Sequence, residues 1–258
     1  MGVLASTVNQ VESVLNTIHG PDNLDTTCVE MGNYSRIPKR IRVGIPVEFN
    51  VSELSNEMML VWKTAAENMC QELDAEIVPV SIPSIRCGLP AYYVIACAEA
   101  ASNLAKYDGI QYGHRSNEQG NGIHADYIET RSEGFGPEVQ KRLLMGSFVL
   151  SSDSYDAYYM NAKRIRDALK LDFKNAFLNA DVLLAPVSAN CKGPTLETAS
   201  KLSSVESYVT DVMTVPASLA GLPCISMPSI TGVNIQLISP FENDFQLLEI
   251  AKLCQGKI

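Results

Sequence analysis

Two adjacent cations, Lys141 and Arg142, lie in the stretch of sequence with the clearest chemical potential, residues 131–150. The stretch reads RSEGFGPEVQKRLLMGSFVL, and its glycines, Gly134 and Gly136, can take backbone angles that are closed to other residues. A cation placed beside such a turn could bind an anionic group such as a carboxylate. The alternative is that the two cations form the solvated face of an ordinary surface helix.

A helix must position these two cations. Pro137 follows the second glycine, and proline suits the first turn of a helix because its missing N–H would have no partner there. The apolar residues that follow recur at helical spacing, which predicts a buried face formed by Val139, Leu143, Leu144 and Phe148. The sequence therefore predicts a glycine-rich turn that leads into a helix carrying both cations.

The sequence contains no recognisable motif for a nucleophilic hydrolase, a nucleotide-binding site or a metal site. The sequence contains no GxSxG, no Walker loop and no GxGxxG. The serine pairs at 151–152 and 203–204 lack flanking glycines, so we interpret them as helix caps or linker. His114 and His124 lie in a polar stretch, 111–126, that we expect to be an exposed loop. No Cys, Asp or Glu recurs near them at ligand spacing, so we expect no metal site.

Composition and charge restrict the class of protein. A chain of 258 residues that is 46% hydrophobic and 19% charged is typical of a globular protein with a sizeable core. The net charge of −9 argues against unaided binding to nucleic acid, since phosphate contacts need clustered Lys and Arg. Seven cysteines without a CxxC pair indicate a reducing compartment. No apolar run approaches the ~20 residues of a membrane span, and the first twenty residues do not resemble a signal or transit peptide.

Helices alternate with short apolar strands along the chain, which predicts an α/β fold with one mixed sheet covered by helices on both faces. Strands are expected at 41–45, 77–80, 181–186, 224–227 and 233–238. Helices are expected at 8–18, from about 55, at 91–107, from 137, and at 154–179, 205–220 and 245–253, with a loop at 83–90. We expect a single domain over residues 1–258.

The first two strands and the helix between them predict a βαβ unit, so these strands should be parallel. Pro79 places the second strand at an edge of the sheet or at a strand end. Thr7 and Gln10 have the spacing of a capping box at the start of the first helix. The buried stripe expected on the second helix consists of Met59, Trp62, Ala66, Met69 and Leu73.

Several runs, in order along the chain, resemble the amidase-signature family. They are YYVI (92–95), EAASNL (99–104), YDGIQYG (107–113), RSEGFG (131–136) and AGLP (220–223). The family in general shares the last run, whereas YDGIQYGHR and RSEGFG are much more specific to the glutaminase subunits of glutamyl-tRNA(Gln) amidotransferases. The form QYGHR at 111–115 resembles the mitochondrial, animal-type branch. The resemblance covers essentially the whole chain and implies the amidase-signature fold.

The same resemblance implies that part of that fold is absent. The family's catalytic lysine and two serines lie in an N-terminal half, within a glycine- and serine-rich signature, and nothing in this sequence resembles that half. We therefore expect this chain to be the C-terminal half of an amidase-signature domain, either a fragment or the product of an alternative start at Met1. We expect no catalytic residues in it and no activity of the chain alone.

Three residues match glutamine-binding positions of the family. Arg142 matches the arginine that binds the α-carboxylate, Asp211 matches the acid that binds the α-ammonium, and Tyr92 matches a tyrosine that lines the pocket. A selective site needs both charges because an unpaired buried charge is costly. Each residue also has a plainer interpretation: Arg142 as a surface cation, Asp211 as a solvated helix residue, and Tyr92 as part of the core.

The function implied by the resemblance is that of a glutaminase component in organellar translation. Glutamine would be hydrolysed through an acyl-enzyme, and the ammonia would pass to a partner subunit that converts Glu-tRNA(Gln) to Gln-tRNA(Gln). The implied partners are the B and C subunits, glutamine, and Glu-tRNA(Gln) contacted through the complex, with no membrane. No cofactor is implied for this chain, whereas the partner subunit would use ATP and Mg²⁺. The implied location is the mitochondrial matrix.

Two other functions remain open. The chain could belong to an amidase for another small amide, which would have no need of the charge pair formed by Arg142 and Asp211. It could also be a truncated, non-catalytic binding module, because it lacks the Lys-Ser-Ser half. Selectivity for glutamine separates the first alternative from the main hypothesis, and catalytic turnover separates the second.

Overall fold

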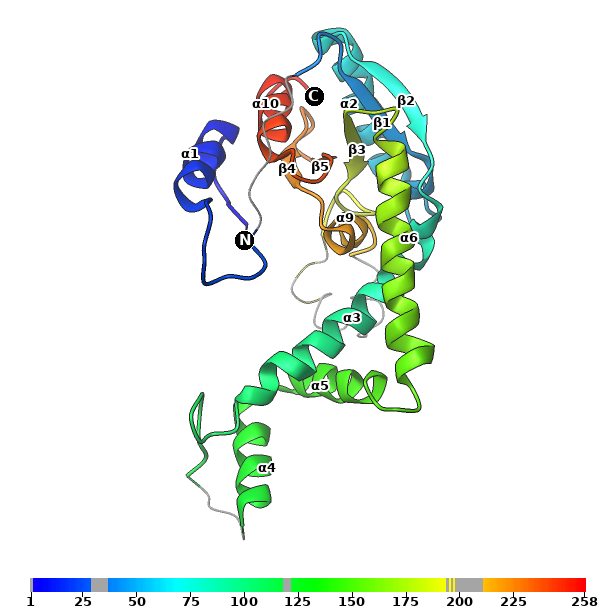
Figure 1. Cartoon of the computed structure of the whole chain (residues 1–258). Helices are drawn as coiled ribbons and strands as arrows, with labels where there is room; N and C mark the ends of the chain where they lie inside the picture. Colours follow the sequence, from blue (N-terminus) through cyan, green and yellow to red (C-terminus); the bar gives the residue numbers. More distant parts are fainter. Residues whose placement is uncertain (1, 29–36, 118–121, 194, 196, 198–210) are drawn as a thin grey trace. The chain divides into compact units, whose positions relative to one another are not determined.

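Five short strands form one mixed sheet in the computed structural model, which describes residues 2–28, 37–117, 122–193, 195, 197 and 211–258 (Figure 1). The strands are β1 (Arg42–Pro46), β2 (Glu76–Val80), β3 (Val182–Pro186), β4 (Cys224–Pro228) and β5 (Asn234–Ile238). Their order across the sheet is β2-β1-β3-β5-β4. β1 is parallel to β2 and β3, whereas β5 is antiparallel to β3 and β4. The predicted α/β fold with a mixed sheet is confirmed, and so is the parallel pairing of the first two strands.

The chain divides into two compact units. One consists of Met1–Leu89 together with Ala168–Ile258 and contains the whole sheet, and the other is Pro90–Asp167. The single domain expected over 1–258 stays a prediction. None of the described helices is both long enough and apolar enough to cross a membrane.

Helices flank the sheet of the first unit. They include α1 (Val8–Ile18), α2 (Asn56–Leu73), α9 (Val215–Ala220) and α10 (Asp244–Cys254). The helix α2 packs against β2 and β3, and α10 packs against β4 and β5. The indole Nε1 of Trp62 donates to the main-chain oxygen of Leu184 at 3.0 Å, which fixes α2 on the central strand.

The starts of the first two helices follow from their capping residues. Thr7 Oγ1 accepts from Gln10 N at 3.3 Å, and Ser55 Oγ accepts from Met58 N at 3.2 Å. Both caps satisfy main-chain N–H groups that would otherwise have no helical partner. The two predicted helix starts are therefore confirmed.

The buried stripe expected on α2 is confirmed at Trp62 and Met69 but is otherwise shifted. The residues buried there are Met58, Val61, Trp62, Ala65 and Met69. Met59, which the prediction placed inside, is 40% exposed. Two overlapping apolar stripes at helical spacing are present in this segment, and Trp62 and Met69 belong to both.

The second unit is helical and contains most of α3 (Gly88–Asn103), together with α4 (Ile123–Gly134), α5 (Pro137–Val149) and the π-helix η4 (Tyr155–Met160). The helix α6 (Asn161–Ala176) continues from η4 into the first unit. The loop expected at 83–90 is wrong, because a 3₁₀ helix (Pro83–Cys87) leads directly into α3. The loop expected at 111–126 ends early, because α4 begins at Ile123.

The glycine-rich turn before α5 differs from its prediction. Gly134 is the last residue of α4, and Gly136 is the N-cap of α5 with an ordinary φ of −65°. Neither glycine therefore uses a backbone conformation that is closed to other residues. Pro137 begins α5 as predicted.

The buried face predicted for α5 is also wrong. Leu144 is 74% exposed and Phe148 is 54% exposed, whereas the buried residues of the helix are Gly146 and Val149. A glycine on the buried side brings the neighbouring helix close, and the large apolar side chains turn away from that contact.

The helices predicted at 154–179 and 205–220 differ from their predictions. The segment expected to begin a helix at 154 forms the π-helix η4 before α6 begins. The helix expected at 205–220 is described only from 211, where a turn precedes α9, and residues 205–210 lie outside the described part of the chain.

Candidate functional site

In the second unit, α3 and α5 meet at a very close approach. A Cβ added to Gly146 would overlap the main-chain carbonyl oxygen of Cys97, and it would lie 2.7 Å from the Cβ of Ala101. Only glycine allows two helix backbones to come this near. The contact fixes α5 against α3, and these two helices carry the predicted site residues Arg142 and Tyr92.

Arg142 lies one turn before this contact and is held between a carboxylate and an aromatic ring. Its Nε is 3.2 Å from Glu138 Oε1, an ion pair between residues i and i+4 of α5. Its guanidinium carbon is 5.8 Å from the ring centroid of Tyr93, a cation–π distance. The side chain is 38% exposed. The structure therefore places Arg142 in a partly buried position with defined neighbours.

Tyr92 belongs to the same group of side chains. Its ring meets the ring of Tyr93 edge-on, with centroids 5.3 Å apart. Both tyrosines are half-buried and lie in the first turns of α3. Tyr92, Tyr93 and Arg142 thus form a continuous set of contacts within one unit.

The electrostatics of this group extend to the thiol of Cys97. Burial raises the pKa of Cys97, the positive charge of Arg142 opposes that rise, and the negative charge of Glu138 adds to it. The thiol is therefore neutral near pH 7. A raised pKa disfavours the thiolate, which is the nucleophilic form of cysteine. Cys97 is also buried, and its main-chain oxygen lies against Gly146 of α5.

Asp211, the third predicted site residue, lies in the first unit, in the turn that precedes α9. Its main-chain oxygen accepts from Thr214 N at 3.2 Å and from Val215 N at 3.0 Å. Its side chain is partly buried. Because Asp211 and Arg142 belong to different units, a joint role of the three predicted residues in one pocket stays a prediction.

A buried amide anchors the turn that carries Asp211. Gln236 in β5 is 3% exposed, and its Nε2 donates to Pro186 O at 2.7 Å and to Met213 O at 2.8 Å. Sequence analysis did not identify Gln236. A glutamine within an apolar strand could have indicated a buried hydrogen bond. The partners of Gln236 are distant in sequence, so residue spacing could not have identified them.

The two most specific runs of the resemblance contact each other in the second unit. Arg131 donates from one guanidinium nitrogen to the main-chain oxygens of Leu104 and Tyr107, at 3.0 and 2.9 Å. His114 Nε2 is 3.1 Å from Glu133 Oε2, and hydrogen bonds from His114 and Ser116 hold the pKa of Glu133 below its usual range. His114 is therefore paired with α4 instead of being simply solvated. These contacts are structural and contain no nucleophile.

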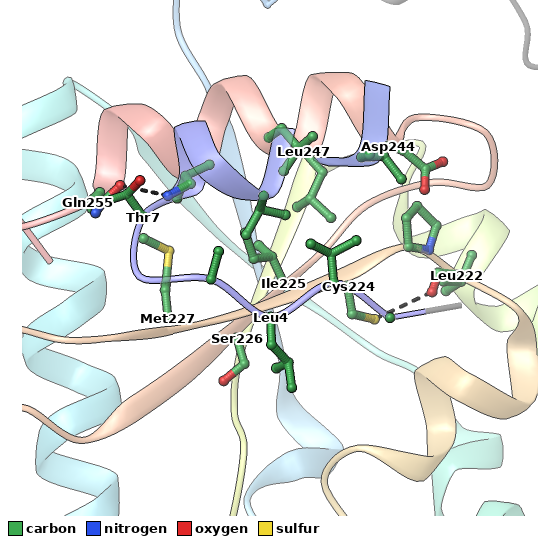
Figure 2. Close-up of a pocket in the computed structure, with 18 of the residues that line it drawn as sticks. Leu4, Thr7, Leu222, Cys224, Ile225, Ser226, Met227, Asp244, Leu247 and Gln255 are labelled. Carbon is green, nitrogen blue, oxygen red and sulfur yellow. Dashed lines mark hydrogen bonds between the residues drawn. The ribbon is translucent and has the colours of Figure 1, made fainter. Parts of the chain in front are cut away.

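Each unit has a cavity in its described part. The larger one, about 630 Å³, lies in the first unit, and Figure 2 shows its wall formed by Leu4 of the N-terminal segment, Ile225 of β4 and Leu247 of α10. The smaller one, about 340 Å³, lies between the 108–115 segment and α4. Neither is lined by Tyr92, Arg142 or Asp211. The described residues also contain no group of three or more His, Cys, Asp or Glu side chains that could hold a metal ion.

Comparisons with known proteins agree with the predicted family and fold. A family model described as Amidase matches residues 1–248. The mitochondrial A subunit of glutamyl-tRNA(Gln) amidotransferase from Candida albicans is 39% identical over 271 residues, covering 97% of this chain and 59% of the relative. The corresponding A subunit from Rhizorhabdus wittichii is 41% identical over 234 residues, covering 88% of this chain and 47% of the relative.

A solved structure gives the same result. The crystal structure of the A subunit of glutamyl-tRNA(Gln) amidotransferase from Thermotoga maritima superposes with a TM-score of 0.69 at 25% identity, covering 96% of this chain and 50% of that chain. This chain thus spans about half the length of the curated relatives it matches. The family model covers nearly the whole sequence, and the chain belongs to the amidase family.

Proposed function

We propose that this chain is the glutamine-recognising part of the glutaminase component of a glutamyl-tRNA(Gln) amidotransferase. The observation that carries the proposal is the placement of Arg142 between Glu138 and Tyr93, whose ring contacts that of Tyr92. Relatives named as the A subunit of this enzyme, at 39% and 41% identity, support it.

The chemistry of glutamine explains why such an arginine is needed. Free glutamine carries an α-carboxylate and an α-ammonium, and a guanidinium matches the planar geometry of a carboxylate. The Glu138 ion pair and the Tyr93 ring fix the direction of the guanidinium. A cation that is already oriented loses less conformational freedom when it binds an anion. Asp211 is the proposed partner of the ammonium.

In the proposed reaction, glutamine and water give glutamate and ammonia. The ammonia is transferred to the B subunit, which uses ATP and Mg²⁺ to amidate Glu-tRNA(Gln), with the C subunit as a further partner. The proposed location is the mitochondrial matrix, since the relative from Candida albicans is named as mitochondrial. We propose that hydrolysis requires groups outside this chain, because its sequence contains no recognisable nucleophile motif such as GxSxG.

The proposal is tested by direct binding, which requires no turnover. We would titrate the purified chain with L-glutamine and with 4-aminobutanamide, which is glutamine without its carboxylate, in an isothermal calorimeter. Arg142→Ala should weaken binding of L-glutamine by roughly tenfold to a hundredfold, the loss expected for a charge-assisted hydrogen bond. It should leave the weaker binding of 4-aminobutanamide unchanged.

Lys141→Ala is the matched control, because Lys141 is the adjacent cation and points about 100° around the helix. It should change neither ligand's affinity. Equal, small effects at Lys141 and Arg142 would reject the proposal and leave α5 with a solvated basic face. If Arg142→Ala weakened binding of both ligands equally, the result would indicate an amidase that does not bind the α-carboxylate and acts on another small amide.

A further inference from the structure

A buried glutamine links the sheet to the turn that carries Asp211. Gln236 lies in β5, opposite Ala185 of β3, and is 3% exposed. Its strand is otherwise apolar where it is buried. A buried amide without hydrogen bonds is costly, so the partners of Gln236 reveal what it holds in place.

Both partners are main-chain carbonyl oxygens of other segments. The amide nitrogen donates to Pro186 O, at the end of β3, at 2.7 Å and to Met213 O at 2.8 Å. A side-chain amide has two N–H donors, and these two bonds account for both. The amide therefore ties the end of a central strand to the segment that precedes α9.

The segment around Met213 is short and closely connected to Asp211. Met213 is fully buried, and the next two residues, Thr214 and Val215, donate their N–H groups to the main-chain oxygen of Asp211. Residues 211–215 thus form a single turn, which the amide of Gln236 anchors to the sheet. A displacement of Met213 O would be transmitted to Asp211, two residues away.

We propose that Gln236 is a positioning residue for amino-acid recognition: by holding Met213 it sets where the Asp211 carboxylate lies, and so tunes selectivity for a substrate with an α-ammonium. This inference rests on the proposed function, because it assigns Asp211 to the ammonium of glutamine. Gln236 itself needs no contact with the substrate. Its effect follows because the strength of a bond between a carboxylate and an ammonium depends steeply on the distance and angle between the two groups.

The test compares two ligands that differ only in the ammonium. L-glutamine and 4-carbamoylbutanoate, which lacks the α-amino group, would be titrated into the whole 258-residue chain and its variants. Gln236→Met removes both donors at similar side-chain volume, and it should weaken binding of L-glutamine by about tenfold. Binding of 4-carbamoylbutanoate should stay unchanged, because that ligand has no ammonium to place.

Gln246→Met is the matched control. Gln246 is a second buried glutamine of the same unit, 7% exposed in α10, and the described contacts include no hydrogen bond from it to residues 211–215. The same substitution there should leave the ratio of the two affinities unchanged. If Gln236→Met does not fold, Gln236→Asn keeps the amide but is one methylene too short to reach both carbonyls, and it should change the ratio in the same direction.

A ligand-free measurement separates this inference from the proposed function. Hydrogen exchange of the Val215 amide, which is bonded to Asp211 O, should be faster in Gln236→Met than in wild type and unchanged in Gln246→Met. A wild-type chain that binds both ligands equally would refute the role of Asp211 in the proposed function. Faster exchange with equal losses for both ligands would mean that Gln236 is only structural, and unchanged exchange would refute the anchor itself.

Discussion

Gly146 lies directly against the main-chain carbonyl oxygen of Cys97, at the point where α5 crosses α3. The contact leaves no room for a Cβ, so the crossing depends on glycine at this one position. Arg142 and Tyr93 lie on these two helices, and the cation–π distance of 5.8 Å between them depends on the same crossing. Packing in the second unit and the orientation of the proposed carboxylate-binding group are therefore coupled.

Gly146→Ala should destabilise the second unit. The added methyl group would have to displace main chain, and overpacking of this kind costs about 1–3 kcal/mol. Thermal unfolding followed by circular dichroism would measure the loss as a lower Tm. Gly134→Ala is the control, because a Cβ there meets nothing nearer than 3.9 Å and alanine favours the helix. Equal Tm values for the two variants would contradict the close approach.

The sequence predicted local structure well where a single residue type determines where a helix begins. The cap Thr7, the start of α2 near Ser55 and the proline at the start of α5 follow from groups close in sequence. The parallel strand pair follows from the order of strand, helix and strand along the chain. The buried face of α2 was predicted only in part and that of α5 wrongly, because the choice between overlapping apolar stripes depends on distant partners. Leu144 and Phe148 continue the helical pattern but face outward, since Gly146 occupies the contact.

The candidate site was predictable only in part, for the same reason. Arg142 and Tyr92 came from a resemblance, not from spacing. The neighbours that orient Arg142 are Glu138, which the i, i+4 spacing could have indicated, and Tyr93, which no local pattern indicates. Gln236 contacts residues that are 50 and 23 positions away, so no sequence window contains the interaction.

The purified chain alone should release no ammonia from glutamine. The sequence has no glycine-flanked serine with a partnering base. A coupled glutamate dehydrogenase assay for ammonia would measure the activity. Loss of an observed activity on substitution of one serine by alanine would identify a nucleophile and contradict this prediction. Activity that survives substitution of every serine would instead indicate a contaminating enzyme.

The chain should bind a hydrophobic dye through the cavity of the first unit. Among the described strands, β4 pairs only with β5, and beside it lies the cavity of about 630 Å³ with a largely apolar wall (Figure 2). Unpaired edge strands and exposed apolar patches are common binding sites for other proteins and for apolar ligands. Fluorescence of anilinonaphthalene sulfonate should rise with the wild-type chain and fall with Ile225→Glu.

Leu144→Glu is the control for this measurement, since it changes an exposed apolar residue of the second unit. It should leave most of the fluorescence in place. A larger decrease with Leu144→Glu than with Ile225→Glu would assign the dye to α5 and contradict the prediction.

The stability of the chain should fall above pH 9 in part because of Cys254. This thiol is fully buried in α10, and burial raises its pKa to about 12 from an ordinary value of 9.0. Above pH 9 the unfolded chain loses the thiol proton while the folded chain keeps it, so unfolding becomes more favourable. The contribution of the buried thiol is fully present below pH 9 and is lost as the pH rises towards 12. Urea unfolding at pH 8 and pH 10 would measure it.

Cys254→Ala removes this titrating group while the other thiols stay. The variant should be less stable than wild type at pH 8, because a buried side chain is shortened. Its free energy of unfolding should then fall less between pH 8 and pH 10, by about 1 kcal/mol for one proton over one pH unit. The exposed thiol of Cys28 provides the matched substitution, and Cys28→Ala should show the wild-type fall. An equal fall in Cys254→Ala and wild type would mean that this thiol ionises alike in the folded and unfolded chains, which would contradict its burial in α10.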